Sequence, residues 1–358
     1  MRKSVLFFIN SEVGGSERMT VNISKMLPQN EFDCKYAIIK DKKYAETATS
    51  ILDFISTNRE IIILETKNHI NKVWMLYRTI KKVKPDIVFA SHYNIIDKVL
   101  IMKPFLRGIK FIVRAENQYS TFSTIKKLII KMTYSKADIL IAQTDEMKSN
   151  FVDNGVLASS RVITLENPVD KEYIDEKLAN VESPFPNDGK KHIVAVGRFH
   201  YQKGYDCLVK AFAQVVKTQK AIDLYIVGSY SGQWRVEYEH VMEIAKEHGV
   251  YEKIHCVGFT NNPYRYVKFA DCFVLSSRWE GLPNVLVEAL YLQTPVAAFK
   301  CIPIIERMVR HGIDGYLAEK DNVEELAEAI LGAIKLNRTC PIYHGATKMD
   351  FINLFKSV

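Results

Sequence analysis

The sequence predicts an α/β protein of two doubly wound domains, each built on a parallel sheet. Short runs of β-branched and aromatic residues alternate with helical patterns along the whole chain, as in repeated βαβ units. The 358 residues are enough for two compact domains of roughly 150–200 residues each. Hydrophobic residues make up 47% and charged residues 25% of the chain, which excludes the disordered, collagen-like and disulfide-scaffold classes.

Each half of the chain contains a series of short strand patterns with helical patterns between them. The first half contains seven, at 4–10, 34–40, 60–66, 86–92, 110–116, 137–144 and 161–166. The second half contains six, at 192–199, 223–228, 253–258, 271–277, 295–299 and 315–318. In open α/β sheets, ligands bind outside the carboxyl ends of the strands. We therefore expect the two domains to face each other across a cleft that holds the active site.

The boundary between the domains is predicted from turn-forming residues. Asn167-Pro168 closes the last strand of the first half, and residues 183–189 are rich in Pro, Gly and Asn and lack periodicity. The predicted division is a first domain at 1–168, a hinge at 169–190, a second domain at 191–335 and a C-terminal segment at 336–358. This last segment can cross back to the first domain.

The excess of positive over negative charge lies entirely in the first half of the chain. Residues 1–170 hold 26 Lys and Arg against 18 Asp and Glu, which accounts for the whole net charge of +8. A nucleic-acid-binding protein usually has a denser basic stripe and a recognisable motif, and neither occurs here. We therefore expect no nucleic acid as a partner, and favour a phosphorylated acceptor or an anionic membrane surface for the first half.

The cysteines and the apolar segments predict a cytoplasmic protein. The six cysteines form no Cys-x-x-Cys pair and mostly lie in apolar runs, as expected for reduced thiols in a core. No segment approaches the roughly 20 apolar residues that a spanning helix needs. The basic and apolar start of the chain is followed by no small-residue cleavage site, so a first strand is expected there and not a signal peptide.

The strongest motif follows the strand at 271–277 and has the form Glu-Gly-Leu-Pro-Asn-Val-Leu-Val-Glu, from Glu280 to Glu288. A helix is expected to begin around Pro283, because the fixed φ of proline suits the first turn. The backbone N–H groups of residues 282–285 would then form an anion site at the positive end of that helix. The two carboxylates, eight positions apart, could address different parts of one ligand. The alternative is a capped surface helix with two solvated glutamates.

Two glycine-containing loops accompany this motif. Gly197-Arg198-Phe-His-Tyr-Gln-Lys203-Gly204 joins a strand to a helix and places two cations five residues apart. Cations and backbone amides are what a diphosphate requires; a plain basic loop of a βα unit is the alternative. Gly14-Gly15 follows the first strand and would let the backbone approach a ligand closely, although a tight turn explains it equally well.

Together these motifs resemble the family-4 retaining glycosyltransferases of the two-Rossmann architecture called GT-B, over nearly the whole chain. The resemblance is strongest from Val194 to Glu288. It implies an acceptor-binding first domain and a second domain that binds a nucleotide-sugar donor. It implies Arg198 and Lys203 on the donor diphosphate, Glu288 on the ribose hydroxyls and Glu280 near the hydroxyls of the transferred sugar. It also implies donor contacts from the glycine loop at Gly14 and Gly15, from Gly258, Phe259 and Thr260 near the base, and from Gly281, Leu282, Pro283 and Asn284 on phosphate.

One position departs from the family pattern. Many members carry a histidine after the fifth strand of the first domain, and here Glu116 occupies that place. His92, at the end of the preceding strand, is a nearby substitute. Either residue could contact the transferred sugar or the acceptor. The alternative for His92 is a strand-end histidine with a satisfied hydrogen bond.

No Asp-x-Asp occurs in the chain, so the usual carboxylate pair for a nucleotide-sugar metal is missing. The charge of the leaving group would instead be stabilised by Arg198, Lys203 and the helix start. We therefore expect no metal and no other cofactor.

The stretch 125–132 predicts a helix with an apolar face, formed by Ile125, Leu128, Ile129 and Met132. One interpretation is an amphipathic helix that covers a sheet. The other is a basic first domain that rests on anionic lipid to reach a lipid-linked acceptor. The cations concerned are Lys81, Lys82, Lys84, Lys103, Arg107, Lys126, Lys127 and Lys131.

The resemblance thus implies a retaining, metal-independent transferase of the hexosyl or N-acetylhexosaminyl type. It would move the sugar from a nucleoside diphosphate, with UDP favoured, to a hydroxyl of a cell-surface glycan or lipid-linked oligosaccharide. We expect it in the cytoplasm, with peripheral attachment to the inner membrane face as one option. Two alternatives stay open. An epimerase of the same architecture would need a different signature from the motif at 280–288, and a donor-binding subunit without turnover would fit the missing histidine.

Overall fold

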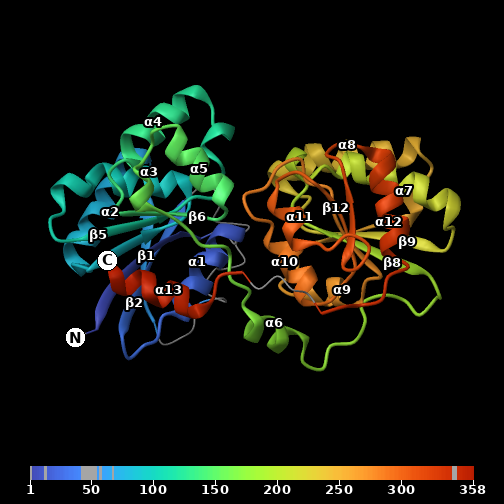
Figure 1. The fold of residues 1–358 in the computed structure, drawn as a ribbon, viewed down its shortest axis with the longest axis horizontal. Helices are drawn as coiled ribbons and strands as arrows, with labels where there is room; N and C mark the ends of the chain where they lie inside the picture. The colour runs from blue at the N-terminus through green and yellow to red at the C-terminus, as the bar shows by residue number, and fades with distance from the viewer. Residues whose placement is uncertain (1, 12–13, 42–54, 56–58, 67, 341–344) are drawn as a thin grey trace. The chain divides into compact units, whose positions relative to one another are not determined.

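The computed structural model describes residues 2–11, 14–41, 55, 59–66, 68–340 and 345–358. The chain divides into two compact units (Figure 1), the first comprising residues up to Pro168 together with Gly345–Val358 and the second Val169–His344. Each unit contains one parallel sheet with helices on both faces. The predicted class of two doubly wound α/β domains is therefore confirmed.

The first unit has a seven-stranded sheet in the order β3-β2-β1-β4-β5-β6-β7. All seven predicted strands occur, at β1 Lys3–Asn10, β2 Phe32–Asp41, β3 Glu60–Thr66, β4 Ile87–Ala90, β5 Lys110–Arg114, β6 Ile139–Ala142 and β7 Val162–Thr164. Several are shorter than predicted at their carboxyl ends. In consequence His92 and Glu116 lie in loops just beyond β4 and β5.

The helices of the first unit cover the two faces of its sheet. They are α1 Gly15–Met26, α2 His69–Val83, α3 Tyr93–Met102, α4 Thr124–Tyr134, α5 Asp145–Asp153 and α13 Lys348–Ser357, with short 3₁₀ turns η3 Lys103–Phe105, η4 Tyr119–Thr121 and η5 Ser159–Arg161. Side chains alternate between the faces along β1. Leu6 and Phe8 join the core beneath α2, α3 and α5, whereas Val5 and Phe7 join the core beneath α1 and α13.

The C-terminal helix α13 packs on the sheet of the first unit. Its Phe355 ring lies 5.9 Å from the Phe89 ring and 6.2 Å from the Phe7 ring, between centroids. Thr347 and Asp350 form a capping box that fixes its start. Of the predicted C-terminal segment, residues 341–344 lie outside the described part of the chain. The first and last helices of the chain thus share one face of the first sheet.

The second unit has a six-stranded sheet in the order β10-β9-β8-β11-β12-β13. Its strands are β8 Lys191–Val196, β9 Ile222–Val227, β10 Ile254–Gly258, β11 Cys272–Leu275, β12 Val296–Phe299 and β13 Gly315–Ala318. Its helices are α6 Lys171–Leu178, α7 Tyr205–Thr218, α8 Arg235–Glu247, α9 Tyr264–Phe269, α10 Asn284–Tyr291, α11 Ile304–Met308 and α12 Val323–Ala333, with η6 Tyr201–Lys203, η7 Gly232–Trp234 and η8 Tyr251–Lys253. Two apolar cores, one on each face, hold these helices to the sheet.

Helix α4 packs on the first unit with a different side from the one that its apolar pattern suggested. Its inward residues are Ile130, Thr133 and Tyr134. The apolar face predicted from the sequence is exposed, with Ile125 at 77%, Leu128 at 61%, Ile129 at 39% and Met132 at 64%. The interpretation that this face covers the sheet is therefore wrong, because a different side of α4 packs inward.

Two further observations concern the membrane and the cysteines. No helix within the described residues is long and apolar enough to cross a membrane. The six cysteines are all free thiols. Cys34, Cys207 and Cys272 are buried, but Cys340 is exposed and so is not part of a core. Burial raises the pKa of the Cys34 thiol to about 11, so that thiol stays protonated near neutral pH.

Candidate active site

Each sheet contains a topological switch point, where the order of the strands reverses. In the second unit this point lies between β8 and β11, and in the first unit between β1 and β4. Ligands of doubly wound sheets bind in the crevice outside the carboxyl ends of the strands at such a point. The loop after β8 carries Arg198 and Lys203, and the loop after β11 carries Glu280. The topology therefore brings two of the predicted motifs to one crevice.

Hydrogen bonds hold these two loops together. The Ser276 hydroxyl donates to the Lys203 carbonyl at 2.8 Å. The Arg278 backbone N–H donates to the Gln202 carbonyl at 2.8 Å, and the Gln202 side-chain amide donates to the Trp279 carbonyl at 2.8 Å. These bonds join the turn η6 directly to the segment before α10.

Lys203 and Glu280 meet in this crevice. The Lys203 ammonium lies 2.7 Å from Glu280 Oε1, and the Ser277 hydroxyl donates to the same oxygen at 2.7 Å. The two side chains are only 19% and 10% exposed. A mostly buried ion pair of this kind fixes the positions of both side chains. Ser277 was not predicted as a site residue, although it lies at the end of the predicted strand that precedes the motif.

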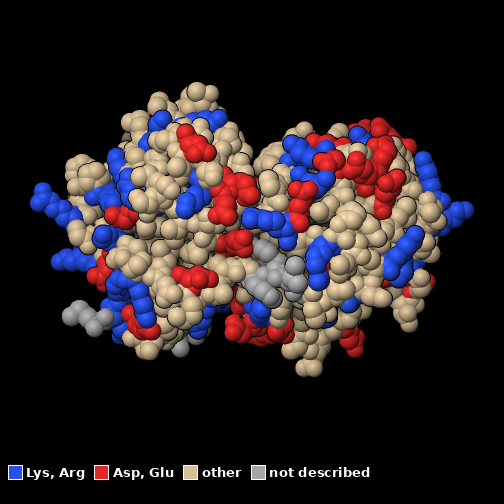
Figure 2. Space-filling view, viewed as in Figure 1, with Lys and Arg blue, Asp and Glu red and all other residues tan. Residues whose placement is uncertain are grey.

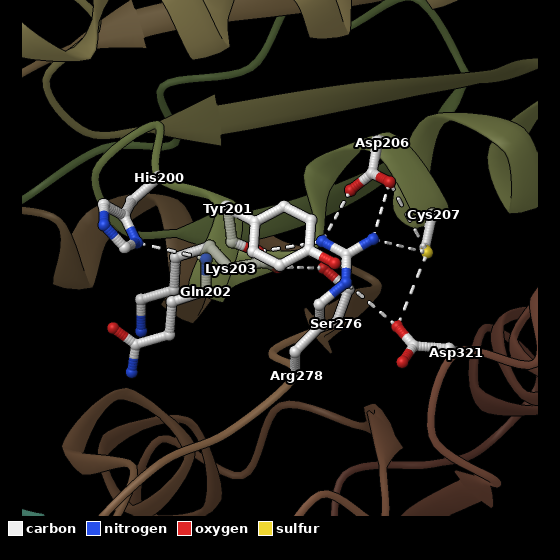
Figure 3. Close-up of polar contacts among 9 residues, drawn as sticks. All are labelled: His200, Tyr201, Gln202, Lys203, Asp206, Cys207, Ser276, Arg278 and Asp321. Atoms are coloured by element: carbon white, nitrogen blue, oxygen red, sulfur yellow. Dashed lines mark hydrogen bonds and ion pairs between the residues drawn. The ribbon is translucent and has the colours of Figure 1, made fainter. Parts of the chain in front are cut away.

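Arg278 forms the centre of a polar cluster next to this pair (Figure 3). Its guanidinium donates to both carboxylate oxygens of Asp206, at 2.9 and 2.6 Å, and to the Tyr201 carbonyl at 2.8 Å. It also lies 3.1 Å from Asp321, in the connection between β13 and α12. Only 8% of Arg278 is exposed. Burial alone would raise the pKa of Asp206, but the hydrogen bonds and charge of Arg278 outweigh it and lower the pKa below its ordinary value.

Arg278 was not singled out by the sequence analysis. The signal available was an arginine between the strand at 271–277 and the motif at 280–288. Its partner Asp206 lies 72 residues earlier in the chain, so no local pattern links the two.

Two glycines allow the backbone segments of this crevice to approach one another. Gly204 has φ +62°, and a Cβ there would lie 2.2 Å from the Ser276 carbonyl oxygen. A Cβ on Gly228 would lie 1.9 Å from the Gly197 carbonyl oxygen. Any larger residue would force the loops apart. Gly228 was not predicted, but three strands end in the same Val-Gly pair, ahead of Arg198, Ser229 and Phe259, and this repetition was the available signal.

The remaining predicted donor residues surround the same sheet edge. Arg198 is exposed, and its guanidinium lies 4.9 Å above the Trp234 ring, so the two predicted cations have different partners. Gly258 accepts a hydrogen bond from the Gly228 N–H at 2.9 Å, and Phe259 beside it is 50% exposed. Thr260 accepts a hydrogen bond from the backbone N–H two residues later, at 3.2 Å.

Helix α10 begins one residue later than predicted. Pro283 is its N-cap, with ψ of 93°, and Asn284 is its first residue. Leu282 and Pro283 are buried and Gly281 is half-buried. The Tyr264 hydroxyl donates to Glu288 at 3.4 Å, one turn into the helix.

His92 and Glu116 meet at the start of α3 in the first unit. The Asn94 backbone N–H donates to His92 Nδ1 at 3.2 Å, and the Tyr93 backbone N–H donates to Glu116 Oε2 at 3.3 Å. Burial lowers the pKa of His92, against the raising effect of the Glu116 charge. A neutral imidazole whose Nδ1 accepts a hydrogen bond carries its proton on Nε2. His92 is therefore both a helix cap, as the simpler alternative expected, and a neutral hydrogen-bond donor.

The glycine loop lies near this pair. Gly14 is the N-cap of α1 and Gly15 its first residue, while residues 12–13 lie outside the described part of the chain. The Ser16 hydroxyl is 3.0 Å from the Ser91 hydroxyl, next to His92. The starts of α1 and α3 therefore adjoin at the switch point of the first sheet.

A buried arginine that the sequence analysis did not single out supports this region. Arg114, at the end of β5, is 3% exposed and donates to Ser91 Oγ at 3.0 Å and to Asn167 Oδ1. Burial lowers its pKa to about 10. Its hydrogen bonds join the segment after β4 to the segment after β7.

Comparison with known proteins agrees with the fold and the motifs. The family model for glycosyl transferases group 1 matches residues 176–344, and that for Glycosyltransferase Family 4 matches residues 13–173. A Campylobacter jejuni protein named N-acetylgalactosamine-N,N'-diacetylbacillosaminyl-diphospho-undecaprenol 4-alpha-N-acetylgalactosaminyltransferase is 24% identical, over 97% of this chain and 94% of its own. An Escherichia coli protein named UDP-Gal:alpha-D-GlcNAc-diphosphoundecaprenol alpha-1,3-galactosyltransferase is 23% identical, over 89% of this chain and 84% of its own.

Solved structures share the fold. The crystal structure of Anabaena HepE in complex with UDP-glucose superposes with a TM-score of 0.76 at 17% identity, covering 93% of this chain and 90% of that one. The apo form of the lipopolysaccharide outer core galactosyltransferase WaaB superposes with a TM-score of 0.69 at 16% identity, covering 99% of this chain and all of that one.

Fold, motif loops and family matches agree on a glycosyltransferase of the GT-B class. Within that class the chain belongs to the family-4-like glycosyltransferases, as both halves match the corresponding models. The predicted resemblance to this family is therefore confirmed.

Proposed function

We propose that this glycosyltransferase is a retaining, metal-independent enzyme that transfers a hexosyl or N-acetylhexosaminyl group from a UDP-sugar to a hydroxyl of a lipid-linked glycan. The observation that carries this proposal is the Lys203–Glu280 pair at the switch point of the second sheet, 2.7 Å apart. One group suits a phosphate and the other a sugar hydroxyl.

The donor would bind along the carboxyl edge of the second sheet. Lys203 and Arg198 would contact the diphosphate, with the backbone of residues 281–284 at the start of α10. Glu288 would accept hydrogen bonds from the ribose, and the segment from Gly258 to Thr260 would lie near the base. The name of the E. coli relative specifies a UDP-linked donor, and HepE has been crystallised with UDP-glucose, which favours UDP.

The chemistry that these residues would support is charge stabilisation. During transfer the bond between the anomeric carbon and the diphosphate oxygen breaks, and negative charge grows on the departing diphosphate. A preorganised cation in a site that is partly shielded from water stabilises this developing charge, and so lowers the energy of the transition state more than that of the ground state. Glu280 would hold the sugar hydroxyls while the acceptor oxygen bonds to the same face of the sugar, which is what retention requires.

The acceptor would be bound by the first unit. The C. jejuni and E. coli relatives are both named for acceptors on diphospho-undecaprenol. A lipid-linked acceptor would bring the enzyme to the inner face of the cytoplasmic membrane. His92 would donate its Nε2–H to the acceptor or to the transferred sugar, with Glu116 beside it.

Metal independence is proposed from the sequence, which has no Asp-x-Asp. Within the described part of the chain, no group of three or more His, Cys, Asp or Glu residues has a geometry that could hold a metal ion. The cationic side chains would take the role that a divalent ion has in other nucleotide-sugar enzymes.

The test is to incubate the purified chain with a panel of UDP- and GDP-sugars and to measure release of the nucleoside diphosphate, with and without a lipid-diphosphate acceptor and in excess EDTA. We expect acceptor-stimulated UDP release that EDTA does not abolish, and an α-linked product from an α-linked donor. Binding without release would support a subunit without turnover. Interconversion of free UDP-sugars would support an epimerase, and rescue by Mg²⁺ after EDTA would contradict metal independence.

A further inference from the structure

The exposed apolar face of α4 has no partner among the described residues of the first unit. Its four side chains are Ile125, Leu128, Ile129 and Met132, which recur at helical spacing, and three of them are more than 60% exposed. Large aliphatic side chains are usually exposed singly, so a contiguous face of four marks an interaction surface.

The inward side of α4 is fixed by specific contacts. Asp97 of α3 pairs with the Lys126 ammonium and accepts a hydrogen bond from the Thr133 hydroxyl at 3.2 Å. Ile130 and Tyr134 complete the buried side. The apolar face therefore cannot turn inward without breaking these contacts.

Neighbouring elements extend the apolar surface. Lys103 of η3 donates to the Lys136 carbonyl at 2.6 Å, just beyond the end of α4, so η3 lies beside it. Ile101, one turn after Asp97 on α3, is 51% exposed, and Phe105 on η3 is 69% exposed. Figure 2 shows few charged side chains on the outermost part of the first unit over α4.

The charge around this surface is positive. Residues 97–138 contain nine Lys and Arg, of which Arg114 is buried, and three acidic residues, Asp97, Glu116 and Asp138. Asp97 and Asp138 pair with Lys126 and Lys103. Helix α4 itself contains three lysines and no acidic residue. Lys126 is engaged with Asp97, but Lys131 is exposed beside the apolar face and Lys127 is half-buried. An apolar face flanked by lysines is typical of helices that lie in the interface of an anionic bilayer.

We propose that the surface of α4, α3 and η3 docks on an anionic lipid bilayer, with Leu128, Met132 and Phe105 entering the interface and Lys127 and Lys131 contacting lipid phosphates. The positive charge favours a bilayer over a second copy of the same chain, because two copies of this surface would repel each other. In a doubly wound sheet each helix begins near the carboxyl edge, so α4 would hold that edge of the first sheet, with His92 and Glu116, close to the lipid. This inference specifies the membrane contact of the proposed function.

The test uses the purified full chain and co-sedimentation with vesicles of phosphatidylcholine, alone or mixed with phosphatidylglycerol, at low and high salt. One variant combines Leu128→Asn with Met132→Asn, and a second combines Lys127→Glu with Lys131→Glu. The matched control is Val236→Asn, which changes a 79% exposed apolar residue on α8 of the second unit. Thermal unfolding of each variant checks that it folds.

We expect the wild-type chain and Val236→Asn to bind the anionic vesicles, more weakly at high salt. Each α4 variant should bind about tenfold or more weakly, since apolar contact and charge both contribute to interfacial binding. If the double asparagine variant does not fold, Leu128→Asn alone provides the test.

Equal binding of all variants would overturn the proposal. So would a wild-type dimer in ultracentrifugation that the asparagine variant converts to a monomer, because that would assign the face to a second copy. UDP release from a water-soluble acceptor analogue, measured without lipid, tests the proposed function separately. If the wild-type chain does not bind the anionic vesicles but still releases UDP, the docking surface is contradicted and the proposed function stands.

Discussion

The Lys203 ammonium is assigned two partners, one observed and one proposed. It pairs with Glu280 at 2.7 Å in the present structure, and the proposed function also assigns it to the donor diphosphate. An ammonium has three N–H donors, so it can contact a carboxylate and a phosphate together. In the proposed function the pair would therefore couple the position of the carboxylate assigned to the sugar to the position of the diphosphate.

Substitution of Lys203 tests this coupling. We expect Lys203→Ala to lower kcat/KM by an amount equivalent to about 2–4 kcal/mol, as loss of one preorganised donor typically does. The measurement is steady-state transfer with a UDP-sugar. Lys191→Ala is the matched control, because Lys191 pairs with Asp271 at 2.8 Å at the opposite end of the same sheet. Unchanged kcat/KM in Lys203→Ala would remove this residue from the donor site.

His92 predicts a pH dependence. Burial lowers its pKa below the ordinary value of 6.5, so the unfolded chain binds more protons than the folded chain just below that value. The stability linked to neutral His92 is thus fully present above pH 6.5 and is lost as the pH falls toward the folded pKa. Protonation of Nδ1 would also remove the acceptor that caps α3 at Asn94.

His92→Asn separates the two roles of this residue. Asparagine can still cap the helix, so the free energy of unfolding should change little, whereas His92→Ala should lose about 1 kcal/mol. Both variants lack the Nε2–H donor, so both should lower kcat/KM and lose the pH dependence contributed by the imidazole. Full activity in His92→Asn would leave His92 with its capping role only.

At the scale of elements, the two motif loops are held together by an arginine that was not predicted to contact either the diphosphate or the sugar. Arg278 joins η6, the start of α7 and the β13–α12 connection through Tyr201, Asp206 and Asp321. Its planar guanidinium bonds both oxygens of Asp206, a geometry that lysine cannot reproduce. Arg278 thus acts on the proposed donor site through the position of Lys203.

Arg278→Lys keeps the charge and removes the two-pronged contact. We expect it to raise the Kd for UDP and to lower kcat about tenfold or more, as loss of a supporting contact typically does in organised sites. Arg278→Ala should also lower the free energy of unfolding by about 3–5 kcal/mol, because it leaves Asp206 without its buried partner. Calorimetric UDP titration and urea unfolding measure the two effects. If the Arg278 variants lower the free energy of unfolding but the folded protein binds UDP with unchanged Kd, Arg278 has a structural role only.

The elements themselves were largely predictable from the sequence, because apolar runs bounded by turns mark each strand. All thirteen strands occur, including the short β13 at Gly315–Ala318. Strand ends were less predictable: the run at 86–92 ends as a strand at Ala90, since the His92 side chain caps α3 instead. The side of α4 that packs inward could not be predicted, because an amphipathic pattern shows an apolar face but not what covers it.

The residues of the proposed site that lie in a local motif were predicted from the sequence. The contacts between them that depend on the order of the strands in the sheet were not. Lys203 and Glu280 each lie in a recognisable loop. Their meeting depends on β8 and β11 being neighbours, which no local pattern encodes. The same holds for Arg278, whose partner is on a separate βα unit.

At the scale of the whole molecule, the chain consists of two units with separate cores. The first core depends on the C-terminal helix, since Phe355 packs against rings of β1 and β4 and is fully buried. The proposed donor residues that contact nucleotide lie mainly in the second unit. We therefore expect UDP binding to stabilise the second unit, and a substitution in the C-terminal helix to destabilise the first unit.

Calorimetry of the intact chain tests this separation. Phe355→Ala should destabilise the first unit by about 3–5 kcal/mol, the usual cost of truncating a buried phenylalanine. UDP at a hundred times its Kd should stabilise the second unit by about 2.7 kcal/mol through mass action. We expect Phe355→Ala to lower one unfolding transition and UDP to raise the other, with Phe105→Ala, a 69% exposed residue of the first unit, as the control that changes neither. If both changes move a single common transition, the two units unfold together, and the stability of the donor site then depends on the C-terminal helix as well.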